Sequence, residues 1–222
     1  MQESRYDIKS CDGFSELKTF RKERIVALIL AAGRSTRMGV FKPLLPLGRR
    51  TILETILHRY RLAGISDILV VLGHRAEEVQ TILDKSSTAC VINDQYDEGM
   101  FSSIRVGAGS LSGACDAFFL HPADIPLVRP ETLRRLISVR AETKKRILYP
   151  CYQQRRGHPP LICETMIPAI LEFNEPGGMR ALLRCYAQES LNVDGDDPGI
   201  LADMDTKEDY DRFLHSGAGE II

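Results

Sequence analysis

A loop near the start of the chain combines small residues with three cations. It reads Leu-Ala-Ala-Gly-Arg-Ser-Thr-Arg-Met-Gly from Leu30 to Gly39, and a lysine follows at position 42. Small side chains let a backbone approach a ligand closely, and successive N–H groups around a glycine turn can surround phosphate oxygens. The charges of Arg34, Arg37 and Lys42 would add to that attraction. We therefore predict a nucleoside triphosphate site here, with a glycine turn carrying solvated arginines as the alternative.

Aspartates in two distant segments have the chemistry of metal ligands. Asp124 follows the apolar run 118–120, and Pro126 stiffens the turn that carries it. Mg²⁺ usually takes one or two carboxylates together with phosphates and waters. Asp205 supplies a second ligand if its loop returns to the same edge, and Asp203 is the alternative. An aspartate that caps its own turn is the other interpretation of Asp124.

Short apolar runs alternate with amphipathic segments along the chain. Ile25–Leu30 is continuous and begins with β-branched residues, as expected of a strand buried on both faces. We predict strands at 25–30, 68–72, 89–92, 117–120, 147–151 and 160–163. We predict helices at 51–63, 76–83, 102–109, 130–139, 165–173, 179–186 and 207–215. This alternation predicts an α/β fold with a mostly parallel, Rossmann-like sheet flanked by helices, and with ligands at the carboxyl ends of the strands.

Two local features refine this prediction. The basic turn 153–157 joins the strands at 147–151 and 160–163, which allows an antiparallel pair. Thr206 precedes the last helix and is the expected N-cap.

The composition fits one globular domain without a nucleic-acid or membrane partner. Of 222 residues 44% are hydrophobic, and 29 Lys and Arg nearly balance 30 Asp and Glu, so no basic field attracts nucleic acid. No apolar run could span a bilayer or act as a signal peptide, and we expect a cytoplasmic protein. The six cysteines form no Cys-x-x-Cys pair, which indicates reduced thiols. We expect an extension over 1–24, disordered or with a short helix at 14–20, a domain over 25–215 and a tail over 216–222.

The loop at 30–42 resembles the signature of nucleotidyltransferases with a glycosyltransferase-A-like fold. Within that group it is most similar to the molybdenum cofactor cytidylyltransferase, or molybdopterin nucleotidyltransferase, family. Further segments resemble this family in the same order, and they are Val71–His74, Asn93–Arg105, Ala123–Pro126, Gly157–Pro159 and Asp203–Tyr210. Two positions depart from the pattern, because Pro160 replaces an aliphatic residue and Gly177–Arg180 is a loose version of Gly-x-Gly-Ala-Arg.

The resemblance implies an enzyme that joins CMP from CTP to molybdopterin and releases pyrophosphate, with Mg²⁺ as the cofactor. The catalytic residues that it implies are Arg37, Lys42 and Asp124, and the metal ligands are Asp124 and Asp205. The nucleotide-binding residues that it implies are Leu30, Ala31, Ala32, Gly33, Arg34, Ser35, Arg37, Lys42, Gly73, Ser102 and Ser103. Alanine at position 31, where guanylyl-transferring relatives carry glycine, favours cytosine.

The resemblance also assigns the second half of the chain to the acceptor. Arg155, Arg156 and His158 cluster beside the expected acceptor cleft, and their charge would suit an anionic pterin phosphate. A solvated turn is the alternative interpretation. A molybdenum hydroxylase is the implied recipient of the product.

Two other functions remain open from the sequence. Nucleotidyl transfer to another phosphorylated acceptor, such as a sugar phosphate or methylerythritol phosphate, would keep the same nucleotide half. A non-catalytic molybdopterin carrier or chaperone would keep the Arg155–His158 region but could dispense with Asp124 and Lys42. Both residues are present, which favours catalysis.

Overall fold

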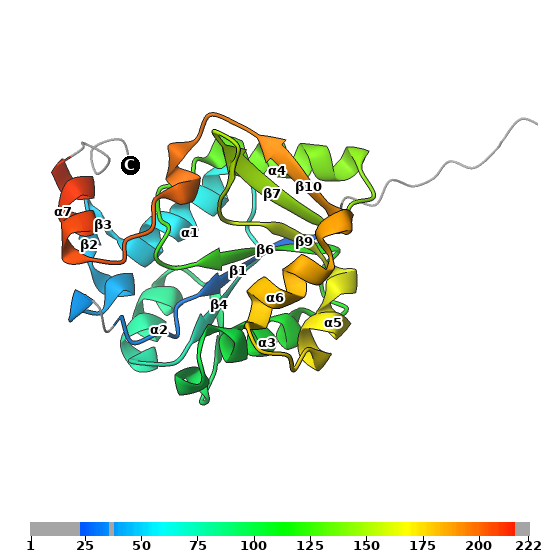
Figure 1. Ribbon diagram of the computed structural model, residues 1–222. Coiled ribbons are helices and arrows are strands. Elements are labelled where there is room, and N and C mark those ends of the chain that lie inside the picture. Colours follow the sequence, from blue (N-terminus) through cyan, green and yellow to red (C-terminus); the bar gives the residue numbers. More distant parts are fainter. Residues whose placement is uncertain (1–22, 36–37, 216–222) are drawn as a thin grey trace, which may run out of the picture.

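The computed structural model describes residues 23–35 and 38–215, and it contains a central sheet flanked by helices (Figure 1). The strands of the sheet follow the order β10-β7-β9-β6-β1-β4-β5, with β8 paired to β7. Their bounds are β1 Ile25–Leu30, β4 Ile68–Leu72, β5 Ala89–Ile92, β6 Ala117–Pro122, β7 Ile147–Tyr152, β8 Arg155–Arg156, β9 Leu161–Cys163 and β10 Ser190–Asp194. The extension, the helix expected at 14–20 and the tail lie outside the described residues.

The sheet is mostly parallel, as predicted. β5, β4, β1 and β6 pair in parallel, and β10 pairs in parallel with β7. β9 runs antiparallel to both β6 and β7, which confirms the antiparallel pair allowed by the basic turn. The carboxyl ends of β1, β4 and β6 therefore meet at one edge of the sheet.

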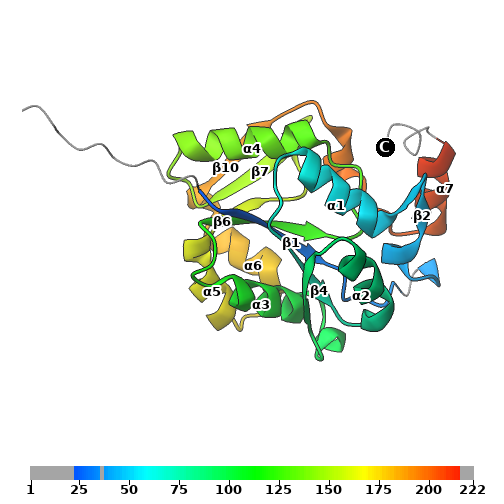
Figure 2. The same cartoon turned by 180° about the vertical axis from the view of Figure 1, so that it is seen from behind.

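Helices cover both faces of the sheet (Figures 1 and 2). On one face pack α1 (Ile52–Leu62), α2 (Ala76–Lys85) and α4 (Pro130–Glu142). On the other pack α3 (Met100–Leu111), α5 (Ile167–Glu172) and α6 (Gly178–Cys185). The last helix, α7 (Lys207–His215), lies beside the small hairpin of β2 (Pro46–Leu47) and β3 (Arg50–Thr51), where Tyr210 donates a hydrogen bond to a backbone carbonyl of β2.

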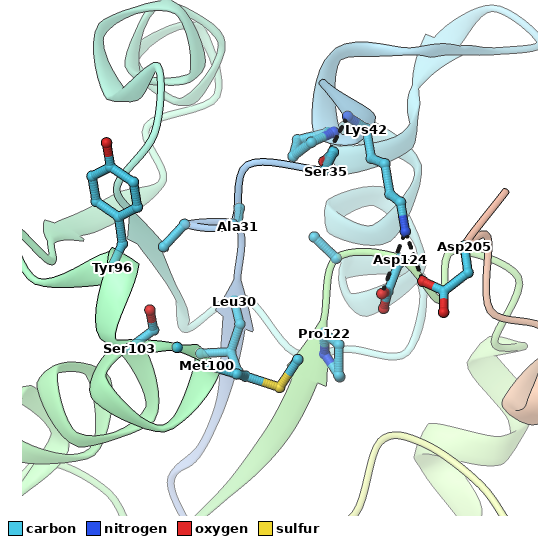
Figure 3. A pocket seen from close by; sticks show the side chains of 15 residues that line it. Leu30, Ala31, Ser35, Lys42, Tyr96, Met100, Ser103, Pro122, Asp124 and Asp205 are labelled. Carbon is cyan, nitrogen blue, oxygen red and sulfur yellow. Dashed lines mark hydrogen bonds and ion pairs between the residues drawn. The ribbon is translucent and has the colours of Figure 1, made fainter. Parts of the chain in front are cut away.

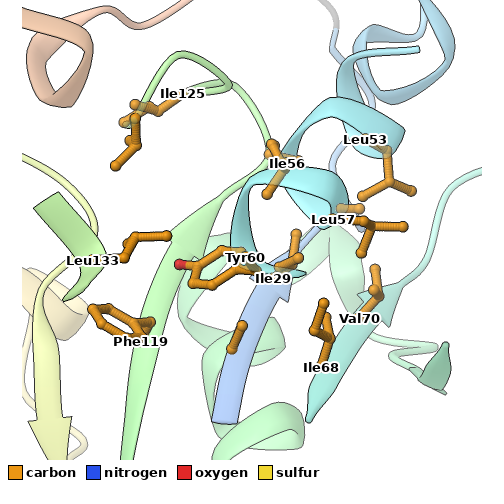
Figure 4. Packing of buried hydrophobic residues seen from close by; sticks show 14 of the residues in the cluster. Ile29, Leu53, Ile56, Leu57, Tyr60, Ile68, Val70, Phe119, Ile125 and Leu133 are labelled. Atoms are coloured by element: carbon orange, nitrogen blue, oxygen red, sulfur yellow. The ribbon is translucent and has the colours of Figure 1, made fainter. Parts of the chain in front are cut away.

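The pleat of β1 divides its apolar side chains between two cores. Ala27 and Ile29 face the side of α1, where Tyr60 and Phe119 complete the packing shown in Figure 4. Val26, Leu28 and Leu30 face α3. At Gly107 of α3 an added Cβ would lie 2.5 Å from Cδ1 of Leu28, so the glycine lets this helix pack tightly on the sheet. This packing holds the end of β1 rigidly from both faces.

The structure also differs from the sequence-based expectations. The strands β2, β3, β8 and β10 were not predicted. β10 is an edge strand that is only partly buried, so its apolar pattern is weak, and the other three have two residues each. The helix predicted at 165–173 is shorter in the structure, because a 3-10 turn precedes α5.

The N-cap prediction for α7 is confirmed, since the backbone N–H of Asp209 donates to Oγ1 of Thr206 at 3.1 Å. Among the described residues no helix is long and apolar enough to cross a membrane.

Candidate functional site

A cavity of about 440 Å³ opens at the sheet edge where β1, β4 and β6 end, and we call it the nucleotide cavity. Of the residues predicted to bind the nucleotide or the metal, the following line it: Leu30, Ala31, Ala32, Gly33, Ser35, Lys42, Ser103, Asp124 and Asp205. Figure 3 shows Lys42, Asp124 and Asp205 on one side of Ala31 and Tyr96 and Ser103 on the other. The cavity thus has a charged end and an end lined by aromatic and small polar side chains.

Backbone hydrogen bonds fix the start of the loop between two neighbouring strand ends. The N–H of Ala31 donates to the carbonyl of Val71 at 2.9 Å, and Ala32 accepts from the N–H of His74 at 3.0 Å. On the other side, Ala123 donates to the carbonyl of Leu30 at 3.0 Å. These bonds hold the floor of the cavity in place.

Lys42 projects its amine into the charged end. It opens the 3-10 helix Lys42–Leu44, and its backbone N–H donates to Oγ of Ser35 at 3.1 Å. Its Nζ lies 2.9 Å from a carboxylate oxygen of Asp205 and 3.8 Å from one of Asp124. Only 10% of the lysine side chain is exposed, so this charge is directed at the cavity.

The two aspartates are brought together by a backbone contact. Asp124 follows β6, and its carbonyl accepts from the N–H of Met204 at 2.9 Å, which returns the loop carrying Asp205 to the same edge. Burial raises the pKa of Asp124, Lys42 lowers it and Asp205 raises it again. Asp203, the alternative ligand, does not line the cavity and instead influences His158.

These carboxylates suit a divalent cation. Both contact the same amine, so they are close enough to share one ion, and Mg²⁺ commonly binds one or two carboxylates together with substrate phosphates. Among the described residues no group of three or more His, Cys, Asp or Glu side chains could form a complete metal cage. The arrangement therefore fits an ion completed by a phosphorylated substrate.

A buried asparagine organises the opposite end of the cavity. Asn93 is 2% exposed, and its Nδ2 donates to the hydroxyls of Ser102 and Ser103, each at 2.9 Å. Ser103 lines the cavity, whereas Ser102 lies outside its lining and bonds to the carbonyls of Gln95 and Gly99. The structure thus separates the roles of two serines that the sequence treated as equivalent.

Gly73 also lies outside the lining. A Cβ at this position would lie 2.8 Å from Cβ of Tyr96 and 2.9 Å from Cβ of Ala32, both of which line the cavity. The glycine therefore lets the two walls approach each other.

One of the predicted cations, Arg34, does not line the cavity. Arg34 is exposed and forms a bidentate ion pair with Asp97, with N–O distances of 2.7 and 2.6 Å, and it does not line the cavity. The sequence assigned the positive charge of Arg34 to phosphate, but in the structure this charge pairs with the carboxylate of Asp97. Arg37 lies outside the described residues.

Several lining residues were not predicted as site residues, namely Pro43, Tyr96, Gly99, Met100, Pro122 and Ala123. Tyr96, Gly99 and Met100 belong to the segment 93–105, whose motif pointed to the site. The motif could not show which of its side chains face inward, because a 3-10 turn at Tyr96–Glu98 interrupts the segment.

A second cavity of about 710 Å³, here the acceptor cavity, adjoins the first. The two share Leu30, Met100 and Pro122 as lining residues. Its lining is largely apolar but includes three arginines, Arg156, Arg180 and Arg184. None of the three forms an ion pair with a described residue, and Arg156 stacks over Tyr149 with its Cζ 4.4 Å from the ring centroid. This cavity can receive an apolar molecule that carries negative charge.

The predicted acceptor residues occupy different places around this cavity. Arg156 and His158 line it, whereas the exposed Arg155 does not. Arg180 and Arg184 were missed, although their spacing of four residues on the predicted helix at 179–186 puts them on one face. Crowding by protein atoms lowers the pKa of His158, although its ring is solvent-accessible, while Asp124 and Asp203 raise it. His158 therefore lies near the border of the two cavities.

Comparison with known proteins agrees with this geometry. Residues 27–192 match the model of a family described as the MobA-like NTP transferase domain. The chain is 26% identical to the molybdenum cofactor cytidylyltransferase of Escherichia coli K12, over 84% of this chain and 93% of that protein. It is 27% identical to nicotine blue oxidoreductase of Paenarthrobacter nicotinovorans, over 86% of this chain and 96% of that protein.

A solved structure extends the comparison to the fold. Rv0371c from Mycobacterium tuberculosis H37Rv matches with a TM-score of 0.72 at 32% identity, covering 87% of this chain and 98% of that chain. The same protein has also been solved in complex with manganese. The expected glycosyltransferase-A-like fold is thus confirmed. The family match spans both the phosphate loop and the strands around the acceptor cavity, and we conclude that the chain belongs to the MobA-like NTP transferase domain family and is a nucleotidyltransferase.

Proposed function

We propose that this nucleotidyltransferase transfers CMP from CTP to molybdopterin and releases pyrophosphate. One observation carries the proposal: the carboxylates of Asp124 and Asp205 and the amine of Lys42 converge beside a small-residue loop, next to an arginine-lined apolar cavity. The similarity to the E. coli cytidylyltransferase supports the choice of nucleotide and acceptor.

The proposal orients CTP along the nucleotide cavity. The triphosphate lies over the loop 30–35 at the charged end, where Lys42 and the predicted Arg37 bind its oxygens. The base lies between Ala31 and the wall formed by Tyr96 and Ser103. Both ends of the cavity then bind chemically matching parts of the nucleotide.

Mg²⁺ is the proposed cofactor, and Asp124 and Asp205 would hold it together with the phosphates. When bound, it stabilises the negative charge that develops on the leaving pyrophosphate. The manganese complex of Rv0371c supports a divalent ion in this family.

The chemistry requires no protein nucleophile. A phosphate oxygen of the acceptor forms a bond to the α-phosphorus of CTP in line with the bond to the β-phosphate oxygen, which breaks. A general base is unnecessary, because a terminal phosphate is already largely ionised near neutral pH. The contribution of the protein is to align the two substrates, and Lys42 contributes positive charge beside the leaving group.

The acceptor cavity supports a flat, anionic acceptor. Its apolar residues suit the pterin, and Arg156, Arg180 and Arg184 suit the negative charge. His158, near the border of the two cavities, would contact the acceptor phosphate. A molybdenum hydroxylase is the proposed recipient of the product.

Product analysis tests this proposal. The purified chain is incubated with Mg²⁺, molybdopterin and each of the four ribonucleoside triphosphates, and the products are identified by mass spectrometry. We expect cytidylylated molybdopterin and pyrophosphate with CTP, and neither with Asp124→Asn as the matched control. A preference for GTP would overturn the cytidylyl assignment, and transfer to a sugar phosphate instead of molybdopterin would overturn the acceptor.

A further inference from the structure

A buried histidine stands behind the turn that carries Asp124. His121 belongs to β6 and is 2% exposed. Its ring makes two hydrogen bonds, with Nδ1 2.8 Å from the hydroxyl of Tyr60 and Nε2 2.8 Å from the carbonyl oxygen of Ile125. His121 lines neither the nucleotide cavity nor the acceptor cavity, so its role is not direct contact with substrate.

The two partners determine which nitrogen carries the proton. A carbonyl oxygen can only accept, so Nε2 donates to Ile125, and the neutral ring then accepts the proton of Tyr60 at Nδ1. Burial lowers the pKa of His121 to about 4, which keeps the ring neutral at physiological pH. Tyr60 is fully buried on α1, and burial raises the pKa of its hydroxyl, which therefore remains a donor. The chain Tyr60–His121–Ile125 thus has one fixed direction.

This chain of hydrogen bonds closes the turn around Asp124. His121 and Ile125 flank the turn, and the ring of His121 donates to the carbonyl of Ile125. The only backbone bond from Ile125 back to the end of β6 is longer, at 3.3 Å to Pro122. On its other side the turn accepts the N–H of Met204, which carries the Asp205 loop. Two hydrogen bonds thus hold this turn, one from the ring of His121 to Ile125 and one from Met204 to Asp124.

We infer that His121, anchored by Tyr60, is a positioning residue that sets the direction in which Asp124 presents its carboxylate to the metal and the triphosphate. The inference rests on the proposed function, because Asp124 is a metal ligand only in that proposal. Losing a hydrogen bond that supports a ligating carboxylate typically lowers metal affinity or activity about 10–100-fold.

Two amide substitutions, each of which replaces one ring nitrogen, separate this role from simple filling of space. The amide nitrogen of His121→Gln reaches the place of Nε2 and can donate to Ile125. In His121→Asn the amide oxygen reaches the place of Nδ1, so the bond to Ile125 is lost while that from Tyr60 is kept. Binding of Mn²⁺ in the presence of CTP, followed through the EPR signal of the free ion and corrected for the Mn²⁺ that the same CTP binds without protein, reports on the metal site without turnover.

We expect His121→Asn to weaken Mn²⁺ binding about tenfold or more. His121→Gln and Tyr60→Phe, which both keep the bond to Ile125 but lose the bond from Tyr60, should weaken binding less than His121→Asn does. Ile170→Ala in α5 is the control, because it destabilises the core on the other face of the sheet without touching the turn.

The outcomes are distinct. Wild-type affinity in both His121→Asn and Tyr60→Phe, or an equal loss in Ile170→Ala, overturns the positioning role while leaving the proposed function intact. A wild-type protein that binds no Mn²⁺ with CTP overturns the proposed function itself, before any substitution is compared.

Discussion

The amine of Lys42 lies 2.9 Å from a carboxylate oxygen of Asp205, a residue 163 positions later in the chain. This contact joins the loop at 30–42 to the C-terminal segment before α7. The charged groups of Lys42, Asp205 and Asp124 therefore lie around one point. One ammonium group beside two ionised carboxylates carries a net charge of −1, and removing any one of the three changes that charge. Each of the three charges can therefore be removed in turn to test the site.

Replacing Lys42 with alanine should weaken CTP binding even without an acceptor. A charge-assisted contact is typically worth about 1.5–3 kcal/mol, so we expect roughly a tenfold loss of affinity or more. Arg34→Ala is the matched control, because its charge is already paired with Asp97 outside the cavity. Titration calorimetry with CTP measures both variants, and an equal loss in the two would contradict the assignment of Lys42.

Asp124→Asn should remove nearly all turnover without lowering stability. Burial raises the pKa of Asp124, which means that its ionised form is disfavoured in the fold. The part of the folding free energy that is linked to this carboxyl group is therefore lost as pH rises through the range between its ordinary and its raised pKa. The asparagine variant does not ionise and does not lose it. Thermal unfolding at neutral pH should give a melting temperature at or above that of the wild type. Near-normal pyrophosphate release by the folded variant would show that Asp124 is not essential.

Arg156 and Arg155 should differ although they are neighbours in sequence. Arg156→Gln should raise KM for molybdopterin about tenfold, because the side chain lines the acceptor cavity, and should leave CTP affinity unchanged. Arg155→Gln should change KM little, because this side chain is exposed outside the cavity. Steady-state kinetics at saturating CTP measures KM for molybdopterin in both variants, and titration with CTP alone measures their CTP affinity. Equal effects, or a loss of CTP affinity in Arg156→Gln, would mean that the two halves are wrongly assigned.

Ala31 should influence the choice of base. It is 3% exposed and lines the nucleotide cavity, so in the proposed function its methyl group would limit the space for a purine. We expect the wild type to use CTP far better than GTP and Ala31→Gly to narrow the difference in kcat/KM. An unchanged ratio in the variant would exclude this residue as the determinant.

The buried His121 should make stability sensitive to acid. Its pKa is lowered from an ordinary 6.5 to about 4, so the unfolded chain binds a proton at a pH where the folded chain does not. The associated stability is complete above pH 6.5 and is lost as pH falls towards 4, by at most about 3 kcal/mol. The pKa values of His58 and His158 are also lowered, so the contribution of His121 is isolated by comparing the wild type with His121→Gln. Denaturant unfolding from pH 7.5 to 4.5 should show a shallower decline in the variant.

Local patterns predicted the parts of the site that are contiguous in sequence. The apolar run before the loop 30–42 and the turn after β6 placed Lys42 and Asp124 at one edge, because parallel strands end together. The sequence favoured Asp205 with Asp203 as the alternative, and it could not show which of the two lines the cavity, since that depends on the backbone bond from Met204 to Asp124 across the fold.

Charge pairing across the fold was equally beyond the sequence. The guanidinium group of Arg34 is of a kind that binds phosphate, but in the structure it forms a salt bridge to Asp97 in a neighbouring loop. Arg180 belongs only to a loose version of a family motif and Arg184 to none, and the packing of α6 against the sheet brings both to the acceptor cavity.

In the sheet the antiparallel strand β9 lies between β7 and β6, and the two cavities are formed by different parts of the chain. The residues that line the nucleotide cavity come from 30–124 and from Asp205, whereas most of the acceptor cavity comes from 149–187. A chimera joined on either side of this second segment could exchange the acceptor cavity for that of a relative and keep the nucleotide chemistry. The segment 200–205 would have to be exchanged together with it. The carbonyl of Ile200 accepts the N–H of His158, and the N–H of Met204 donates to the carbonyl of Asp124.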